Sequence, residues 1–271
     1  MRTVYVNGEY LPENEATVSI FDRGFLFADG VYEVTTVING KLIGFEGHIE
    51  RLQRSVNELK MPIKVDRDEM LDIHRELVKR NNIDQGMIYL QYTRGNPGDR
   101  DFVFPPEDTK PTLVLFTQEK QVVGTAVEET GLKVISVDDL RWGRRDIKTV
   151  QLLFPSLAKM EAKSRGADDA WLVQDEFVTE GTSNNAYIVK DGVIITRNLS
   201  NDILHGITRK SILNCAELLQ MKVEERPFSI AEVHTADEAF STSASGFANP
   251  IIEMDGKPVG NGKPGPVAGK L

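Results

Sequence analysis

Tight hairpin turns are the feature of the sequence that most restricts the fold. Asn-Gly dipeptides at 7–8 and 39–40, and an Asp-Gly dipeptide at 191–192, each separate short runs of alternating or β-branched residues. These dipeptides favour two-residue turns because both central positions of such turns need a positive φ. We therefore expect antiparallel hairpins in both halves of the chain.

Helical periodicity appears between these hairpins. Apolar residues at Ile49, Leu52, Val56 and Leu59 have helical spacing, and residues 67–82 form a second amphipathic pattern. Helices are also expected near residues 206–221 and 229–236. Because strands and helices interleave without a strict βαβ rhythm, the pattern predicts an α+β fold. No GxGxxG motif follows a strand and no GxxxxGK[ST] motif occurs, which disfavours the large families of nucleotide-phosphate binders.

The length allows one large domain or two smaller ones. The chain has 271 residues, of which 40% are hydrophobic and 27% charged, an ordinary globular composition. A polar stretch lies between the two patterns of strands and helices. We expect a small N-terminal domain over residues 1–118, a linker over 119–125 and a larger C-terminal domain over 126–271.

Charge and cysteine content exclude several classes of protein. A net charge of -9 argues against a nucleic-acid partner, because phosphate neutralisation needs a basic face. No apolar run reaches the length of about 20 residues needed to span a membrane, and the N-terminal residues do not resemble a signal peptide. Cys215 is the only cysteine, which excludes an internal disulfide and fits a cytoplasmic location. The four histidines lack metal-ligand spacing, so no metal site is expected.

Lys148 lies in a charged segment, DDLRWGRRDIKTVQLLF. On this segment alone, a solvated surface charge is the favoured interpretation. The alternative is an amine in a partly dry pocket. Burial and the cations Arg144 or Arg145 would then lower its pKa and make it nucleophilic toward carbonyls.

Glu180 lies in a second segment, FVTEGTSNNAYIV. We expect a strand to end at Val178, with Glu180 just beyond it in a polar turn. An exposed acid in a hairpin is one interpretation. The other is a carboxylate that pairs with a protonated ring nitrogen, as a pyridinium electron sink requires, with residues 182–185 supplying hydrogen bonds around it.

Two further segments could bind phosphate. In LHGITRKSIL, Thr208 could cap a helix whose N-terminus presents unpaired N–H groups. In FSTSASGF, consecutive small residues could let backbone N–H groups converge on an anion. A plain helix cap and a generic serine-rich loop explain them equally well. Together, however, an amine, a carboxylate and two phosphate cradles are the parts of a pyridoxal 5′-phosphate site.

The sequence resembles the fold-type IV (class IV) pyridoxal-phosphate aminotransferases, and among them most closely the D-amino-acid transaminases. The resemblance rests on FDRGFLFADGVYEV, HIERL, YTRG, RWGRRDIKTVQLL, VTEGTSNNAYIV, HGITR and STSAS, in this order along nearly the whole chain. RDIK at 145–148 followed by VTEGTSNN at 178–185 is specific to this family. The resemblance implies a two-domain architecture with a small N-terminal α/β domain and a larger C-terminal domain that has a β-barrel-like core.

The same resemblance assigns roles to individual residues. It implies that Lys148 forms a Schiff base with the cofactor and shuttles the proton, and that Glu180 pairs with the pyridine nitrogen. The remaining cofactor contacts fall on Arg51, Leu204, Ile207, Thr208, Ser243 and Ala244. Many relatives have Thr at the last of these positions, so Ala244 keeps only its backbone N–H.

Substrate recognition departs from the family pattern at one position. The resemblance places Tyr32 and Arg100 around the substrate, but Phe102 stands where the D-amino-acid transaminases have a histidine. A guanidinium can still bind a carboxylate bidentately. The implied reaction moves an amino group from a D-amino acid such as D-alanine to a 2-keto acid by a ping-pong mechanism. Because such loops are donated across a subunit boundary in this family, a homodimer is implied.

Phe102 keeps other activities open. A branched-chain L-amino-acid transaminase or an (R)-selective amine transaminase would use the same cofactor chemistry. More remote alternatives are a lyase of the aminodeoxychorismate type and a non-catalytic dimeric binding protein that retains the scaffold.

Overall fold

The computed structural model describes residues 1–271 and divides them into two compact units. The first unit comprises residues 1–122 and 147–151, and the second comprises 123–146 and 152–271. The first break lies within the segment expected as a linker. Residues 147–151, which include Lys148, group with the first unit, whereas the sequence placed them in the C-terminal domain. The domain boundaries themselves stay a prediction.

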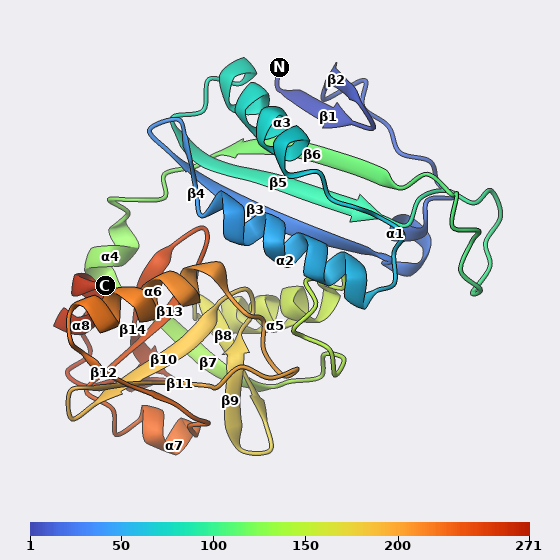
Figure 1. The fold of residues 1–271 in the computed structure, drawn as a ribbon. Helices are drawn as coiled ribbons and strands as arrows, with labels where there is room; N and C mark the ends of the chain where they lie inside the picture. The colour runs from blue at the N-terminus through green and yellow to red at the C-terminus, as the bar shows by residue number, and fades with distance from the viewer. The chain divides into compact units, whose positions relative to one another are not determined.

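The first unit contains a six-stranded antiparallel sheet with strand order β2-β1-β6-β5-β3-β4 (Figure 1). The strands are β1 (Thr3–Val6), β2 (Glu9–Pro12), β3 (Gly30–Ile38), β4 (Lys41–Ile43), β5 (Gln85–Thr93) and β6 (Thr112–Glu119). Both predicted Asn-Gly hairpins are confirmed. Asn7 and Gly8 join β1 to β2, Asn39 and Gly40 join β3 to β4, and all four have positive φ.

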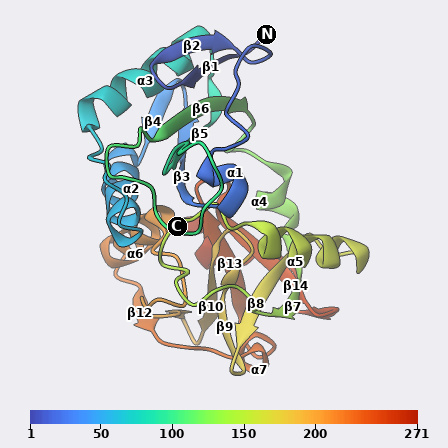
Figure 2. The ribbon, with the colours of Figure 1, turned by 90° about the vertical axis from the view of Figure 1, so that its right-hand side faces the viewer.

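Two predicted helices, α2 (Phe45–Glu58) and α3 (Arg67–Arg80), cover one face of this sheet (Figures 1 and 2). Their apolar stripes pack in the core of the unit, where Leu52 and Leu77 are fully buried. Asp66 caps α3 by accepting from the N–H groups of Asp68 and Glu69. A short helix, α1 (Arg23–Phe27), precedes β3. The opposite face of the sheet, which these helices do not cover, carries a row of aromatic side chains, Tyr32, Tyr89 and Phe116.

The second unit contains a nine-stranded mixed sheet with order β12-β11-β10-β13-β14-β7-β8-β9, and β15 pairs with β14. Its strands are β7 (Leu132–Asp138), β8 (Asp169–Gln174), β9 (Phe177–Gly181), β10 (Asn185–Lys190), β11 (Val193–Thr196), β12 (Lys222–Glu225), β13 (Glu238–Ser243), β14 (Phe247–Met254) and β15 (Lys257–Pro258). β9, at one end of the order, also contacts β10. The sheet therefore curls on itself, and the expected α+β fold with a barrel-like core is confirmed.

Helices and large aromatic side chains complete the second unit. Trp171, Tyr187, Phe228 and Phe240 are fully buried, and the Trp171 indole N–H donates to Ser241 Oγ at 2.9 Å. The predicted hairpin at residues 191–192 joins β10 to β11. The helices are α4 (Ala126–Thr130), α5 (Leu153–Ser164), α6 (Ile207–Leu218), α7 (Ile230–Val233) and α8 (Pro266–Lys270).

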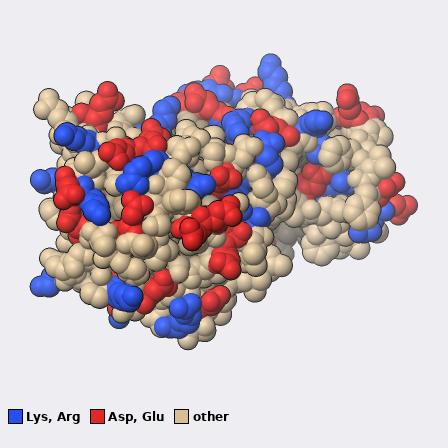
Figure 3. Space-filling model, turned by 90° about the horizontal axis from the view of Figure 1, so that it is seen from below, with Lys and Arg blue, Asp and Glu red and all other residues tan.

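The surface carries charges of both signs. Acidic and basic side chains are interspersed on the face seen in Figure 3. None of the helices combines the length and the apolar character that crossing a membrane requires.

Candidate active site

Lys148 lies on an extended segment that docks on the first unit. The Tyr32 N–H donates to the Lys148 carbonyl at 3.0 Å, and the Val150 N–H donates to the Gly30 carbonyl at 3.1 Å. The Lys148 N–H is directed at Ser55 Oγ at 3.3 Å. These bonds extend the sheet at the N-terminal end of β3, which explains why the segment belongs to this unit.

Alternation along this segment sets the direction of the lysine. Ile147 and Thr149 are buried, and Ile147 belongs to the core of the first unit. Since neighbouring side chains of an extended segment point to opposite faces, Lys148 is directed away from that core. Its Nζ lies 4.2 Å from the centroid of the Tyr32 ring, and the side chain is half-buried. Lys148 is thus an amine held against an aromatic ring.

Tyr32 belongs to a stacked row on the face of the sheet that the helices leave open. Its ring stacks on Tyr89 with centroids 5.5 Å apart, and Tyr89 stacks on Phe116 at 4.9 Å. Burial raises the pKa of the Tyr89 phenol above its ordinary value. The row fixes the Tyr32 ring beside Lys148, so the structure brings together a residue expected to bind the cofactor and one expected to bind the substrate.

Arg51, a predicted phosphate ligand, is buried and engaged by an acid that the sequence did not single out. Its Nε and Nη2 donate to the two carboxylate oxygens of Glu33, each at 2.7 Å, and His48 Nδ1 lies 2.7 Å from Glu33 Oε2. Burial alone would raise the pKa of Glu33. The charge and hydrogen bonds of Arg51, with those of His48, outweigh burial and lower this pKa to about 2. The pair holds Arg51 in one orientation.

Arg100 and Phe102 lie in the loop between β5 and β6. The Arg100 guanidinium lies 4.8 Å from the centroid of the Phe27 ring and 4.9 Å from that of Phe102. Both side chains are exposed. Within the first unit, the Arg100 guanidinium therefore contacts two aromatic rings and pairs with no carboxylate.

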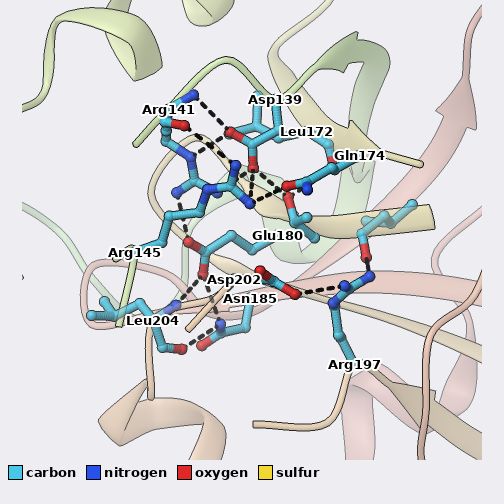
Figure 4. Close-up of polar contacts among 12 residues, drawn as sticks. Asp139, Arg141, Arg145, Leu172, Gln174, Glu180, Asn185, Arg197, Asp202 and Leu204 are labelled. Atoms are coloured by element: carbon cyan, nitrogen blue, oxygen red, sulfur yellow. Dashed lines mark hydrogen bonds and ion pairs between the residues drawn. The ribbon is translucent and has the colours of Figure 1, made fainter. Parts of the chain in front are cut away.

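Glu180 is the centre of a buried polar network in the second unit (Figure 4). Its Oε1 accepts from Arg141 Nη1 at 2.6 Å. Its Oε2 accepts from the Leu204 N–H at 2.9 Å and from Asn185 Nδ2 at 3.1 Å. The prediction that the strand ends at Val178 was wrong, because β9 continues to Gly181 and contains Glu180. The carboxylate is fixed from both sides by strand and loop donors.

Burial and charge act on Glu180 in opposite directions. Burial raises its pKa, the Arg141 charge lowers it, and the net pKa is above the ordinary value. Asp139 also accepts a bidentate pair of bonds from Arg141, at 2.9 and 2.7 Å. Burial would raise the pKa of Asp139, but the hydrogen bonds and charge of Arg141 lower it. Arg141 therefore binds two carboxylates, of which Glu180 has a raised pKa and Asp139 a lowered one.

The sequence analysis did not identify Arg141 or Asp139 as residues of the site. It named Arg144 and Arg145 as the cations near Lys148. Arg144 instead pairs with Asp146 at 3.0 Å, and Arg145 donates to Gln174 at 2.7 Å and lies 3.4 Å from Asp139. An acid followed two residues later by an arginine, directly after a strand, was the available signal. It could not reveal which carboxylate the arginine also reaches.

Side chains of the turn after Glu180 donate hydrogen bonds to two different carboxylates, those of Glu180 and Asp169. Asn185 donates to Glu180 and also to the Leu204 carbonyl at 2.9 Å. Thr182 and Asn184 donate to Asp169 instead, which corrects the expectation that they surround Glu180. Asp169 thus stabilises the turn that positions Asn185.

The two predicted phosphate cradles lie at the start of α6 and at the end of β13. α6 begins at Ile207, its N-cap is Gly206, and no side chain caps it, so Thr208 is not the cap. The N–H groups of the first turn are the donors that an anion would use. Gly206 has no room for a Cβ, because that atom would overlap Asn185 Oδ1. In the other cradle, β13 ends at Ser243 and half-buried Ala244 follows it.

The residues of the chain fit a pyridoxal phosphate. The chain offers a half-buried amine at Lys148, a buried carboxylate with raised pKa at Glu180, and an uncapped helix N-terminus. These are the groups that bind the aldehyde, the ring nitrogen and the phosphate of that cofactor. The side chains offer no group of three or more His, Cys, Asp or Glu that could hold a metal ion.

Comparison with solved structures identifies the fold. The chain is similar to the branched-chain aminotransferase of the thermophilic archaeon Thermoproteus uzoniensis with norvaline, with a TM-score of 0.85 and 25% identity over 99% of this chain and 91% of that one. A second branched-chain amino acid aminotransferase, whose crystal structure contains pyridoxamine 5′-phosphate, has a TM-score of 0.90 and 26% identity over 98% of this chain and 90% of its own. The fold is therefore that of the fold-type IV aminotransferases.

Comparison of sequences identifies the family. The model of amino-transferase class IV matches residues 30–253. The D-alanine aminotransferase of Staphylococcus aureus (strain MSSA476) is 40% identical over 100% of this chain and 95% of its own length. That of Listeria monocytogenes serotype 1/2a (strain 10403S) is 38% identical over 99% and 93%. The chain belongs to the class IV aminotransferases and is a pyridoxal-phosphate-dependent enzyme.

Proposed function

We propose that this enzyme transfers the amino group of a D-amino acid, such as D-alanine, to a 2-keto acid by a ping-pong mechanism. The observation that carries the proposal is the contact between Lys148 Nζ and the Tyr32 ring at 4.2 Å. It joins the amine expected to bind the cofactor to the residue expected to orient the substrate. The D-alanine aminotransferases that match the whole chain support the choice of substrate.

The residues that the family resemblance assigns would hold the cofactor. Lys148 would bind it covalently through Nζ, and Glu180 would hold a proton at the ring nitrogen. Phosphate would be bound by Arg51, by the backbone of Ile207 and Thr208, and by Ser243 and the Ala244 N–H, while Leu204 would pack on the ring. When bound, the cofactor supplies an electron sink for charge that develops on the substrate.

Lys148 would also carry the proton transfer. Its free amine would remove the proton from the substrate Cα and return it, acting as general base and then as general acid. The Tyr32 ring, fixed by its stack on Tyr89, limits the positions that the amine can reach. Arg100 would bind the substrate carboxylate bidentately, and Phe102 would present an apolar surface beside it.

We further propose a cytoplasmic homodimer whose partners are a small-molecule amino donor and a keto-acid acceptor. The net charge of -9 supports such substrates over nucleic acid, and the single cysteine supports a reducing compartment. The dimer is supported by α5, where Leu153, Leu157 and Met160 are 74%, 57% and 65% exposed at spacings of four and three residues. An apolar stripe of this kind favours burial against another chain.

The first experiment replaces Lys148 with alanine, with Lys64→Ala as the matched control because Lys64 is exposed and unassigned. We expect Lys148→Ala to lose both the absorption band of the lysine-linked cofactor and transaminase turnover. Lys64→Ala should keep both. A Lys148→Ala enzyme that retains the band and full turnover would contradict the proposal.

The second experiment compares donors. D-alanine, L-leucine and an (R)-arylamine are offered with 2-oxoglutarate as acceptor, and we expect D-alanine to give the highest kcat/KM. A branched-chain L-amino-acid transaminase is the second candidate, because Phe102 is apolar and the Thermoproteus uzoniensis enzyme shares the fold. Preference for L-leucine would select it, and preference for the arylamine would select an amine transaminase. Pyruvate release without an amino acceptor would indicate a lyase.

A further inference from the structure

Arginine and phenylalanine side chains make successive cation–π contacts within the first unit, which we call the arginine–phenylalanine stack. Phe104 contacts two guanidinium groups, 3.8 Å from that of Arg94 and 5.6 Å from that of Arg23. Phe27 contacts the guanidinium groups of Arg23, at 4.5 Å, and Arg100, at 4.8 Å. The arginine–phenylalanine stack is thus Arg94, Phe104, Arg23, Phe27, Arg100 and Phe102. It runs from two buried arginines to an exposed one.

The inner end of the stack is rigid. Arg23 and Arg94 are buried, and both donate from Nε to the same oxygen of Asp29, at 2.7 and 2.8 Å. Arg94 also donates to the carbonyls of Lys60 and Leu59. Two cations on one buried carboxylate and two backbone carbonyls leave these guanidinium groups little freedom.

The buried arginines at the inner end also fix the backbone of the loop between β5 and β6, which contains Arg100 and Phe102. Arg23 Nη1 donates to the Asp101 carbonyl at 2.6 Å and lies 3.4 Å from the Val103 carbonyl. These two carbonyls flank Phe102 in the chain. The position of the Phe102 backbone is therefore set from the buried side of the unit.

Arg100 lies at the outer end against two aromatic rings. Its guanidinium lies over the rings of Phe27 and Phe102, which meet edge to face with centroids 5.3 Å apart. It forms no ion pair with its neighbours Asp99 and Asp101. A cation–π contact occupies no hydrogen-bond acceptor, so the N–H groups of Arg100 can still donate to a carboxylate.

We infer that Phe27 and Phe102 are positioning residues that hold the Arg100 guanidinium ready to bind a substrate carboxylate. This inference rests on the proposed role of Arg100 in substrate binding. Phe102 donates no hydrogen bond to the substrate. It orients the one cation that binds the carboxylate, so a phenylalanine serves where the D-amino-acid transaminases have a histidine. The substrate class remains a carboxylate-bearing donor, and the apolar ring favours a small apolar side chain beside it.

The test measures KM and kcat for D-alanine in the holoenzyme, together with the absorption band of the bound cofactor. Phe102→Leu should raise KM about two- to fivefold, the factor expected for one exposed cation–π contact, without changing kcat or the cofactor band. Phe102→Tyr retains the ring and should restore the original KM. Val103→Ala, an exposed position in the same loop, is the matched control and should change nothing.

A double mutant separates positioning from direct contact. Arg100→Gln alone should raise KM more than Phe102→Leu does. In the Arg100→Gln background, Phe102→Leu should have no further effect, because the group that it positions is absent. A full additive effect would overturn the inference, as would an unchanged KM in Phe102→Leu beside a raised KM in Arg100→Gln. An unchanged KM in Arg100→Gln would instead refute the proposed role of Arg100.

Discussion

Arg141 donates to Glu180 at 2.6 Å while it holds Asp139 bidentately on its other edge. A permanent cation therefore lies against the carboxylate proposed to hold the ring proton of the cofactor. Without that cation, buried Glu180 would lose its ion-pair partner and Asp139 would keep only Arg145, at 3.4 Å. The charge state of Glu180 is thus a property of the three residues together.

Arg141→Met should destabilise the protein by about 3–5 kcal/mol at pH 7, the usual cost of removing one partner from a buried ion pair. The loss should be smaller at pH 5. With the cation gone, burial raises the pKa of Glu180 further above its unfolded value, so protonation of Glu180 relieves the cost as pH falls. Urea unfolding at the two pH values measures this. Arg165→Met, which breaks an exposed pair with Glu161, is the control and should cost less than about 1 kcal/mol.

Glu180→Gln should keep cofactor binding and lower kcat by about a hundredfold or more, the size of a general acid–base contribution. A neutral amide can still accept hydrogen bonds from Leu204 and Asn185, but it cannot hold a pyridinium proton. Cofactor titration and steady-state kinetics measure the two effects separately. An unchanged kcat would exclude the role given to Glu180.

His74 should make stability depend on pH between about 4 and 6.5. It is buried against the Phe45 ring, and burial lowers its pKa to about 4, although its bond to the Met70 carbonyl opposes this. In this window the unfolded chain binds a proton at His74 that the folded chain does not. Stability is therefore full above pH 6.5 and falls by about 3 kcal/mol toward pH 4. His74→Gln should remove this part of the pH dependence in denaturant unfolding, and an unaltered slope would contradict the assignment.

Gly206→Ala should weaken both the fold and the cofactor site. The new Cβ overlaps Asn185 Oδ1, so the amide must leave Glu180 and the Leu204 carbonyl. We expect a loss of about 1–3 kcal/mol, as for other overpacked positions, and a higher Kd for pyridoxal phosphate. Gly269→Ala, where a Cβ meets nothing within 4 Å, is the control for adding a methyl group. Equal Kd values in the two variants would exclude the effect.

Local features of the fold could be predicted, because their causes are local. The hairpins at Asn7-Gly8 and Asn39-Gly40 depend on residues that tolerate positive φ, and α2 and α3 depend on apolar spacing. The prediction that Thr208 caps α6 was wrong, because a residue distant in sequence decides the position of the cap. Thr208 is a good capping residue, but Gly206 has that position because the Asn185 side chain fills the space beside it.

The polar network of the site could not be predicted, because sheet topology decides it. Arg141 and Glu180 are 39 residues apart and meet because β7, β8 and β9 are neighbours in one sheet. Glu33 and Arg51, 18 residues apart, meet because α2 packs on the face of β3. A motif can thus indicate which residues act, while their charge partners depend on strand order.

The grouping of residues 147–151 with the first unit makes the two units interdependent in folding. The chain passes between them after residues 122, 146 and 151, so no single cut separates them. A fragment that begins at residue 123 would contain Lys148 but not β3, and its lysine would have neither the Tyr32 backbone nor the Tyr32 ring to dock on. Conversely, residues 1–122 alone would leave the N-terminal end of β3 without its added strand. Each half of this enzyme thus lacks a peptide that only the other can supply, and complementation between the two fragments would be needed to place the lysine.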